Sequence, residues 1–282
     1  MARSASLLGV SFTIYVIVML GSYQATAHAS LAAPEEVHLR PPPELRSMSV
    51  RYQWHGHLER GMLLRADQLV RYVDEYAEHE RFYGTWQLVQ LVRRGAQRVA
   101  EQFPGAQLPV GELSAEHGGR IAGHHSHRNG RDIDIGFYLT DDAGQPAVAR
   151  DFVPISRKSG LSHFAGTAYH FDDARNWALL AKLLDDDDAR VQFVFVAGTL
   201  QRRLLAEAKR VSAPDFLIAR ARAVMMEPTE GNRHQSHFHV RIYCPAEDRP
   251  YCTDRPPYFP WYDGVPPGGQ LAATMHGIPL LQ

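Results

Sequence analysis

Two short segments of the sequence, Asp132–Leu139 and His237–Tyr243, alternate apolar and polar side chains with a period of two. Successive side chains of an extended strand point to opposite faces, so this pattern predicts two strands that each bury one face. The predicted core faces consist of Ile133, Ile135, Phe137, Leu139, Phe238, Val240 and Ile242. The opposite faces carry Asp132, Asp134, Gly136, Tyr138, His237, His239 and Arg241. If the two strands lie near each other in one sheet, carboxylates and imidazoles will point toward a shared site.

Histidines are concentrated in and beside these strands. Of the fifteen histidines in the chain, six lie within residues 124–127 and 234–239. A lone His-x-His or Asp-x-Asp pattern is weak evidence of function, because polar strand faces often carry such residues. Both patterns together, in alternation with apolar residues, favour a metal site.

The predicted metal ligands are His127, Asp134 and His239. Catalytic zinc sites take three protein ligands from His, Asp or Glu and keep one position open for water. The ion then lowers the pKa of that water to about 7. His237 lies on the same strand face as His239, so we expect it to stand beside the metal and take a proton from the water.

The neighbours of this set have smaller predicted roles. Asp132 is expected to fix the tautomer of a ligand histidine. Arg241 is expected to pair either with Asp132 or with a substrate carboxylate, and the sequence leaves both open. His125 is expected to be solvated or to contact a ligand. Other histidines are expected in surface or hydrogen-bonded loops: His117, His163 and His170.

The remaining periodicity predicts an α+β fold, with a mainly antiparallel sheet that carries the site and helices packed outside it. Helices are expected at Trp86–Phe103 (with Thr85 as N-cap), Phe171–Leu184 and Thr199–Arg210, and a further helix after a capping box at Ser212–Asp215. Additional strands are expected at Leu108–Leu113 and Val191–Val196.

Charge and the N-terminus limit the classes of protein. Lys and Arg number 30 against 31 Asp and Glu, so there is no electrostatic case for nucleic-acid binding. Arg3, the apolar run Leu7–Leu20 and small residues around Ala27 and Ala29 predict a cleavable signal peptide. A retained membrane anchor is the alternative, but the run is short for a bilayer-spanning helix. In an exported protein, Cys244 and Cys252 are expected to form a disulfide.

Two motifs carry a resemblance to a known family. Ser126–Asp134 and His234–Arg241 resemble the penicillin-insensitive murein endopeptidases, which belong with lysostaphin-type peptidases, D-Ala-D-Ala dipeptidases and the hedgehog N-terminal domain. The resemblance covers roughly residues 61–252. Glu112 departs from it, since Asp is expected there, and the chain has fewer cysteines than better-known members.

The resemblance implies the same zinc ligands, with His237 as the catalytic histidine. It also implies that His124 and His234 lie near the metal and orient water or stabilise the oxyanion. The expected organisation is a signal peptide (1–29), a Pro-rich linker (30–46), a zinc metallopeptidase domain (47–252) and a C-terminal tail rich in proline and aromatic residues (253–282).

The expected activity is zinc-dependent hydrolysis of D,D-peptide cross-links in peptidoglycan, at D-alanyl-meso-diaminopimelyl bonds, by an exported periplasmic enzyme with no stable membrane insertion. One rival is a catalytically silent, zinc-stabilised domain that binds the wall or a protein. His237 argues against it, because a binding site needs no base. A second rival is a non-haem Fe(II) oxygenase, since two histidines and a carboxylate also form a facial triad. The wide His127–Asp134 spacing and export argue against that rival.

Overall fold

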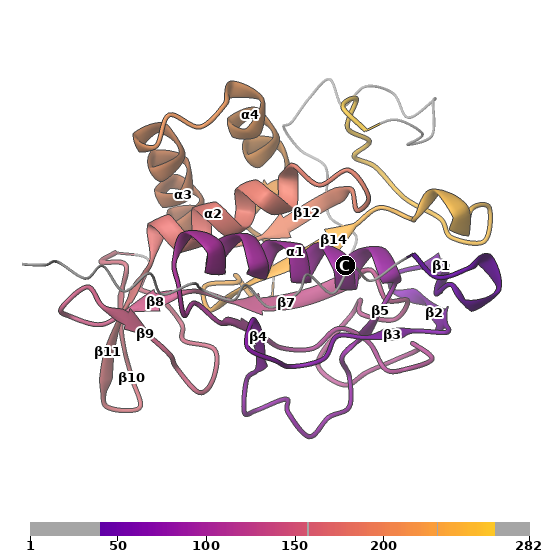
Figure 1. Ribbon diagram of the computed structural model, residues 1–282, viewed down its shortest axis with the longest axis horizontal. Coiled ribbons are helices and arrows are strands. Elements are labelled where there is room, and N and C mark those ends of the chain that lie inside the picture. The colour runs from indigo at the N-terminus through magenta and orange to yellow at the C-terminus, as the bar shows by residue number, and fades with distance from the viewer. Residues whose placement is uncertain (1–39, 157, 230, 263–282) are drawn as a thin grey trace, which may run out of the picture. The chain divides into compact units, whose positions relative to one another are not determined.

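A six-stranded sheet holds both alternating segments as adjacent strands, β7 (Asp132–Gly136) and β14 (His237–Ile242), in the computed structural model (Figure 1). The strand order is β13-β12-β14-β7-β6-β4. The three central pairings, β12 with β14, β14 with β7 and β7 with β6, are antiparallel, and the two outer pairings are parallel. The predicted α+β fold with a mainly antiparallel sheet is therefore confirmed.

The structure describes residues 40–156, 158–229 and 231–262. The predicted signal peptide, most of the predicted linker and the end of the predicted tail lie outside these residues. None of the helices in the described ranges combines the length and the apolar character needed to cross a membrane.

The other elements surround the central sheet. Its remaining strands are β4 (Val70–Tyr72), β6 (Leu108–Val110), β12 (Val191–Phe195) and β13 (Met225–Met226). The helices are α1 (Trp86–Gln102), α2 (Asp173–Leu184), α3 (Gly198–Arg210) and α4 (Asp215–Val224), with short 3-10 turns at Pro43–Leu45 and Ala246–Asp248. Two smaller sheets have two strands each: β1 (Met48–Tyr52) pairs with β2 (His55–Glu59), and β3 (Met62–Leu63) pairs with β5 (Tyr83–Gly84). A four-stranded sheet has the order β10 (Leu161–Phe164), β11 (Thr167–Phe171), β8 (Leu139–Thr140) and β9 (Pro146–Ala147).

Side chains cap helices α1 and α2, whereas the residues before α3 and α4, Ala197 and Pro214, provide no side-chain cap. The Thr85 hydroxyl accepts a hydrogen bond from the Leu88 amide at 3.3 Å, and Asp172 caps α2 in the same way through Arg175. The capping box expected at Ser212 is wrong. Ser212 has φ of +52°, and the residue before α4 is Pro214, which has no side chain that can cap.

Helices α1 and α2 pack together and cross the sheet in Figure 1, and their apolar faces share one core with the sheet. Ile133, Ile135, Phe238, Val240 and Ile242 all belong to that core and are at most 2% exposed. The opposite face of β7 and β14 is therefore left for the polar side chains.

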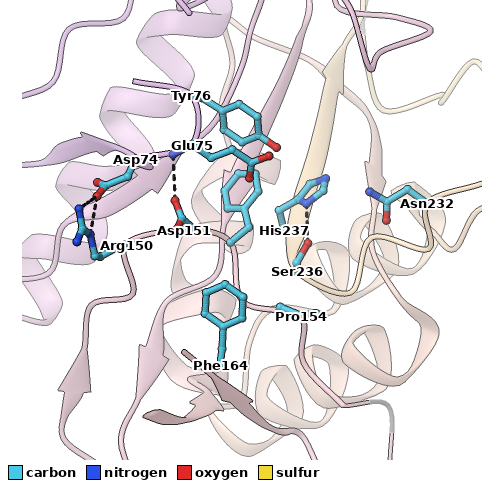
Figure 2. Close-up of a pocket in the computed structure, with 11 residues that line it drawn as sticks. Asp74, Glu75, Tyr76, Arg150, Asp151, Pro154, Phe164, Asn232, Ser236 and His237 are labelled. Carbon is cyan, nitrogen blue, oxygen red and sulfur yellow. Dashed lines mark hydrogen bonds and ion pairs between the residues drawn. The ribbon is translucent and has the colours of Figure 1, made fainter. Parts of the chain in front are cut away.

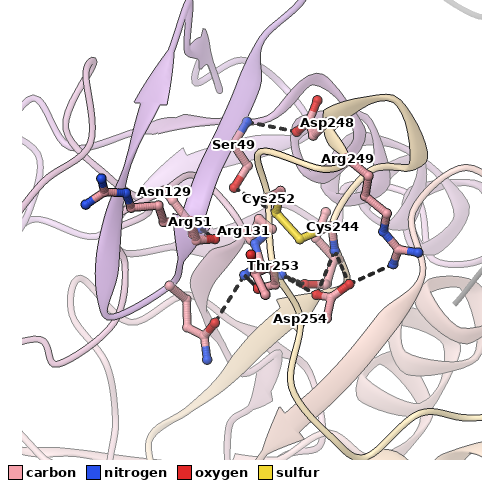
Figure 3. The surroundings of a disulfide bond; sticks show 12 residues. Ser49, Arg51, Asn129, Arg131, Cys244, Asp248, Arg249, Cys252, Thr253 and Asp254 are labelled. Carbon is pink, nitrogen blue, oxygen red and sulfur yellow. Dashed lines mark hydrogen bonds and ion pairs between the residues drawn. A yellow bond between two sulfur atoms is a disulfide. The ribbon is translucent and has the colours of Figure 1, made fainter. Parts of the chain in front are cut away.

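The segment that follows β14 is cross-linked by a disulfide between Cys244 and Cys252 (Figure 3). This disulfide was predicted from the sequence and is confirmed. Beyond the disulfide, Asp254 accepts a hydrogen bond from Arg131 at 2.7 Å, and both side chains are completely buried. Residues 253–262, which the sequence assigns to a tail, therefore contribute to the domain interior, where Phe259 and Tyr262 join the core.

We expect Asp254→Ala to lower the free energy of unfolding by roughly 3–5 kcal/mol, because it leaves the buried Arg131 charge without its partner. Chemical denaturation measures this difference. The matched control is Asp188→Ala, which removes a half-exposed carboxylate 3.5 Å from Arg94 and should cost less than about 1 kcal/mol. Equal losses in the two variants would contradict the role given to Asp254.

Candidate active site

The register of β14 against β7 determines which polar side chains meet. His239 lies opposite Asp134, Arg241 opposite Asp132, and His237 opposite Gly136. The carboxylates and imidazoles of the two strands therefore share one face of the sheet, as the alternation predicts.

His127 reaches the same point from the loop before β7. Its backbone has φ of +63°, and its Nδ1 atom lies 2.7 Å from the Leu113 carbonyl oxygen. Because a carbonyl only accepts hydrogen bonds, Nδ1 carries the proton and Nε2 presents its lone pair. That lone pair faces Asp134, whose Oδ1 atom is 3.5 Å away.

His239 is oriented by Asp132, as predicted for that carboxylate. The His239 Nε2 atom lies 2.7 Å from Asp132 Oδ1, which leaves Nδ1 facing Asp134 Oδ1 at 3.4 Å. Arg241 also donates to Asp132, through Nε at 2.7 Å, so of the two open alternatives the structure contains the Arg241–Asp132 pair. Burial opposes ionisation of Asp132, but the charge of Arg241 and the hydrogen bond to His239 outweigh it and hold the Asp132 pKa well below its ordinary value.

The spacing around Asp134 fits a metal ion better than hydrogen bonding. Its Oδ1 atom lies 3.4 to 3.6 Å from nitrogens of His239, His127 and His237. Two ligands about 2.0–2.1 Å from a tetrahedral zinc ion are about 3.3 Å apart. His127 Nε2 and Asp134 Oδ1 are also buried without a hydrogen-bond partner, which is costly unless a cation lies between them. The residues present therefore fit a divalent metal ion.

Two overlapping triads could hold that ion. The donor atoms of His124, His127 and Asp134 all lie within 4.8 Å of one another. This group contains two of the three predicted ligands, with His124 in the place of His239. The ligand set His127, Asp134 and His239 stays a prediction.

The side chain of His237 is buried beside Asp134. It is 6% exposed, its ring stacks on Phe152 with centroids 4.8 Å apart, and Ser236 Oγ lies 3.0 Å from its Nδ1. Burial lowers the pKa of His237 to about 4, against the opposing charge of Asp134. Its imidazole is therefore neutral near pH 7 and can accept a proton.

His234 and His124 lie beside other members of this group. The His234 ring centroid is 5.0 Å from that of His237, and burial followed by the charges of neighbouring histidines lowers its pKa to about 3. The His124 ring lies 4.1 Å from that of His127. All six predicted site residues are thus brought together.

Glu112 is the most important residue whose role the sequence did not predict. It is almost completely buried, and its two oxygens lie 2.8 Å from His124 Nε2 and 2.8 Å from His79 Nδ1. Arg81 also donates to it at 3.0 Å. Glu112 therefore orients His124. In the sequence it was noticed only as a departure from the family pattern, within the strand expected at Leu108–Leu113.

The site opens into a cavity of about 770 Å³. Glu112, His124, Asp134, His234, His237, His239 and Arg241 line it, together with aromatic side chains such as Trp54 and Tyr76. Of the other histidines, His117, His125 and His163 are exposed, and His170 pairs with Asp142 at 2.8 Å. His163 and His170 lie in strands β10 and β11, however, and not in loops as expected.

Comparison with known proteins places this site in a family. The family model described as penicillin-insensitive murein endopeptidase matches residues 55–266, which include both histidine clusters. The chain belongs to this family. It is similar to penicillin-insensitive murein endopeptidases of Salmonella arizonae (27% identical, covering 81% of this chain and 77% of that protein) and Salmonella paratyphi C (27%, 86% and 81%). The predicted family is confirmed, and membership supports a peptidase that acts on peptidoglycan.

For this murein endopeptidase family member, we expect Asp132→Asn to weaken divalent metal binding about 10- to 100-fold, because the residue that orients His239 loses its charge. Competition titration with a metal indicator measures this. Asp142→Asn, which alters the Asp142–His170 pair at a similar distance of 2.8 Å, is the matched control and should leave metal affinity unchanged. An unaltered affinity in Asp132→Asn would exclude His239 as a ligand held by Asp132.

Proposed function

We propose that this chain is an exported, periplasmic zinc endopeptidase that hydrolyses D,D-peptide cross-links of peptidoglycan, at D-alanyl-meso-diaminopimelyl bonds. The observation that carries the proposal is the convergence of His127 and His239 on the buried, unpartnered oxygen of Asp134, in a member of a murein endopeptidase family.

His127, Asp134 and His239 would hold the zinc ion. When bound, zinc polarises the scissile carbonyl and lowers the pKa of a coordinated water to about 7. His237, neutral and shielded by Phe152, takes the proton from the attacking water and passes it to the leaving amine. His124, oriented by Glu112, and His234 orient the water and stabilise negative charge on the carbonyl oxygen.

The direct test is incubation of the mature protein with cross-linked muropeptide dimers, followed by identification of the products by mass. We expect dimers to be converted to monomers, conversion to stop with a chelator, and zinc to restore it. A folded sample that binds metal and wall fragments but cleaves no dimer would support the silent binding domain instead. Iron in the purified protein would support the oxygenase.

Substitution of the two β14 histidines separates ligand from base. His239→Ala should lose both metal and activity, whereas His237→Ala should keep the metal and turn over about 10²–10⁴-fold more slowly. Metal analysis and single-turnover rates on the same samples give both values. The core neighbour Phe238 is untouched, so both variants should remain folded.

His124→Ala decides between the two candidate triads. With His239 as the third ligand, this variant should retain its zinc. If His124→Ala lost the metal and His239→Ala kept it, the group of His124, His127 and Asp134 would be the ligand set.

A further inference from the structure

A second cavity, of about 760 Å³, also reaches His237 (Figure 2). Four residues line both cavities: Glu75, Tyr76, Asn232 and His237. The two cavities therefore form two arms of one cleft that meet at His237. A peptide cleaved at this point extends away from the scissile bond in two directions and needs both arms.

The wall of the second cavity next to His237 is built by Phe152. Its ring stacks on His237, and two glycines leave room for it. A Cβ atom added to Gly136 would lie 2.9 Å from Phe152 Cε1, and one added to Gly111 would lie 2.7 Å from its Cζ. Both distances are closer than real Cβ contacts, so Phe152 occupies this place only because these positions are glycine. Phe164 and Pro154 continue the apolar lining.

The charges of the second cavity are unbalanced. Apart from Tyr76, its ionisable lining consists of Asp74, Glu75, Asp151, Arg150 and His237. Asp74 and Arg150 neutralise each other at 2.6 Å, and Figure 2 shows this pair at the side of the cavity away from His237.

The two remaining carboxylates differ in their roles. Asp151 accepts a hydrogen bond from the backbone amide of Glu75 at 3.0 Å and so holds that segment in place. Glu75 lies between Tyr76 and His237 in Figure 2 and interacts with the Tyr76 hydroxyl, but it forms no ion pair with a cationic side chain of the described residues. Glu75 also lines the first cavity, where Arg81 and Arg241 are already paired with Glu112 and Asp132.

We infer that this second cavity is a subsite for the half of the cross-linked peptide that carries a free ammonium group. The inference rests on the proposed function, because it takes a cross-linked peptide as the substrate. A diamino acid residue with one amino group outside any peptide bond offers an aliphatic stem and an ammonium. The stem packs against Phe152 and Phe164, and the ammonium binds the Glu75 carboxylate.

The test uses three synthetic cross-linked peptides that differ at this amino group alone: free, acetylated and dimethylated. Acetylation removes the charge, whereas dimethylation keeps it and adds bulk. With the full-length mature enzyme, we expect kcat/KM to be about tenfold higher for the free and dimethylated peptides than for the acetylated one.

Glu75→Gln should reduce this preference to within about twofold while leaving the zinc content unchanged. Glu78→Gln, which removes an exposed carboxylate that lines neither cavity, is the matched control and should keep the full preference. A Glu75→Gln enzyme with the parent's preference, or one that loses rate equally on all three peptides, would overturn the subsite. If the parent enzyme cleaved none of the peptides nor natural muropeptide dimers, the proposed function itself would fail.

Discussion

The antiparallel pairing of β7 with β14 is the constraint on which the site depends. Its register places His239 opposite Asp134 and Arg241 opposite Asp132. Because side chains alternate between faces, a slip of one residue would send the histidines into the apolar core and Phe238 and Val240 into the cavity. The same hydrophobic burial that stabilises the sheet therefore also fixes the geometry of the site.

Burial of the charged groups of this site would lower the stability of the fold if these charges were not balanced. Asp132 and Asp134 are almost inaccessible to water, and a buried carboxylate is tolerated only when it is paired. Arg241 and His239 both contact the Oδ1 atom of Asp132, and Arg241 supplies its counter-charge, whereas Asp134 forms no ion pair with an arginine or a lysine of the described residues and its Oδ1 atom has no hydrogen-bond partner. Asp132, which orients His239, is thus neutralised within the protein. Asp134, on which the imidazoles converge, is left to bind a cation.

The regular parts of this site could be predicted together with their positions, whereas loop residues such as His127 could be named from the sequence but not placed. Period-two alternation identifies β7 and β14, and the polar residues on them follow directly. His127 depends on a loop with a positive φ, and Phe152 on space left by glycines in other segments, so neither placement leaves a local pattern. Ser212 shows the opposite error, since its residue type suits a cap but its backbone does not form one. Glu112 was noticed only as a departure from the family pattern, and its contacts to His124 and His79 are long-range.

The contact between Asp132 and His239 joins residues 107 positions apart. A chain that emerges with its N-terminus first therefore presents His124, His127 and Asp134 long before β14 exists, and β7 has an open edge until then. Only when residues 237–242 have been added can His237 and His239 take their places. A chain truncated before residue 234 lacks His234, His237 and His239, half of the six residues brought together at the site. The site is therefore complete only when the last strand of the central sheet has paired with β7.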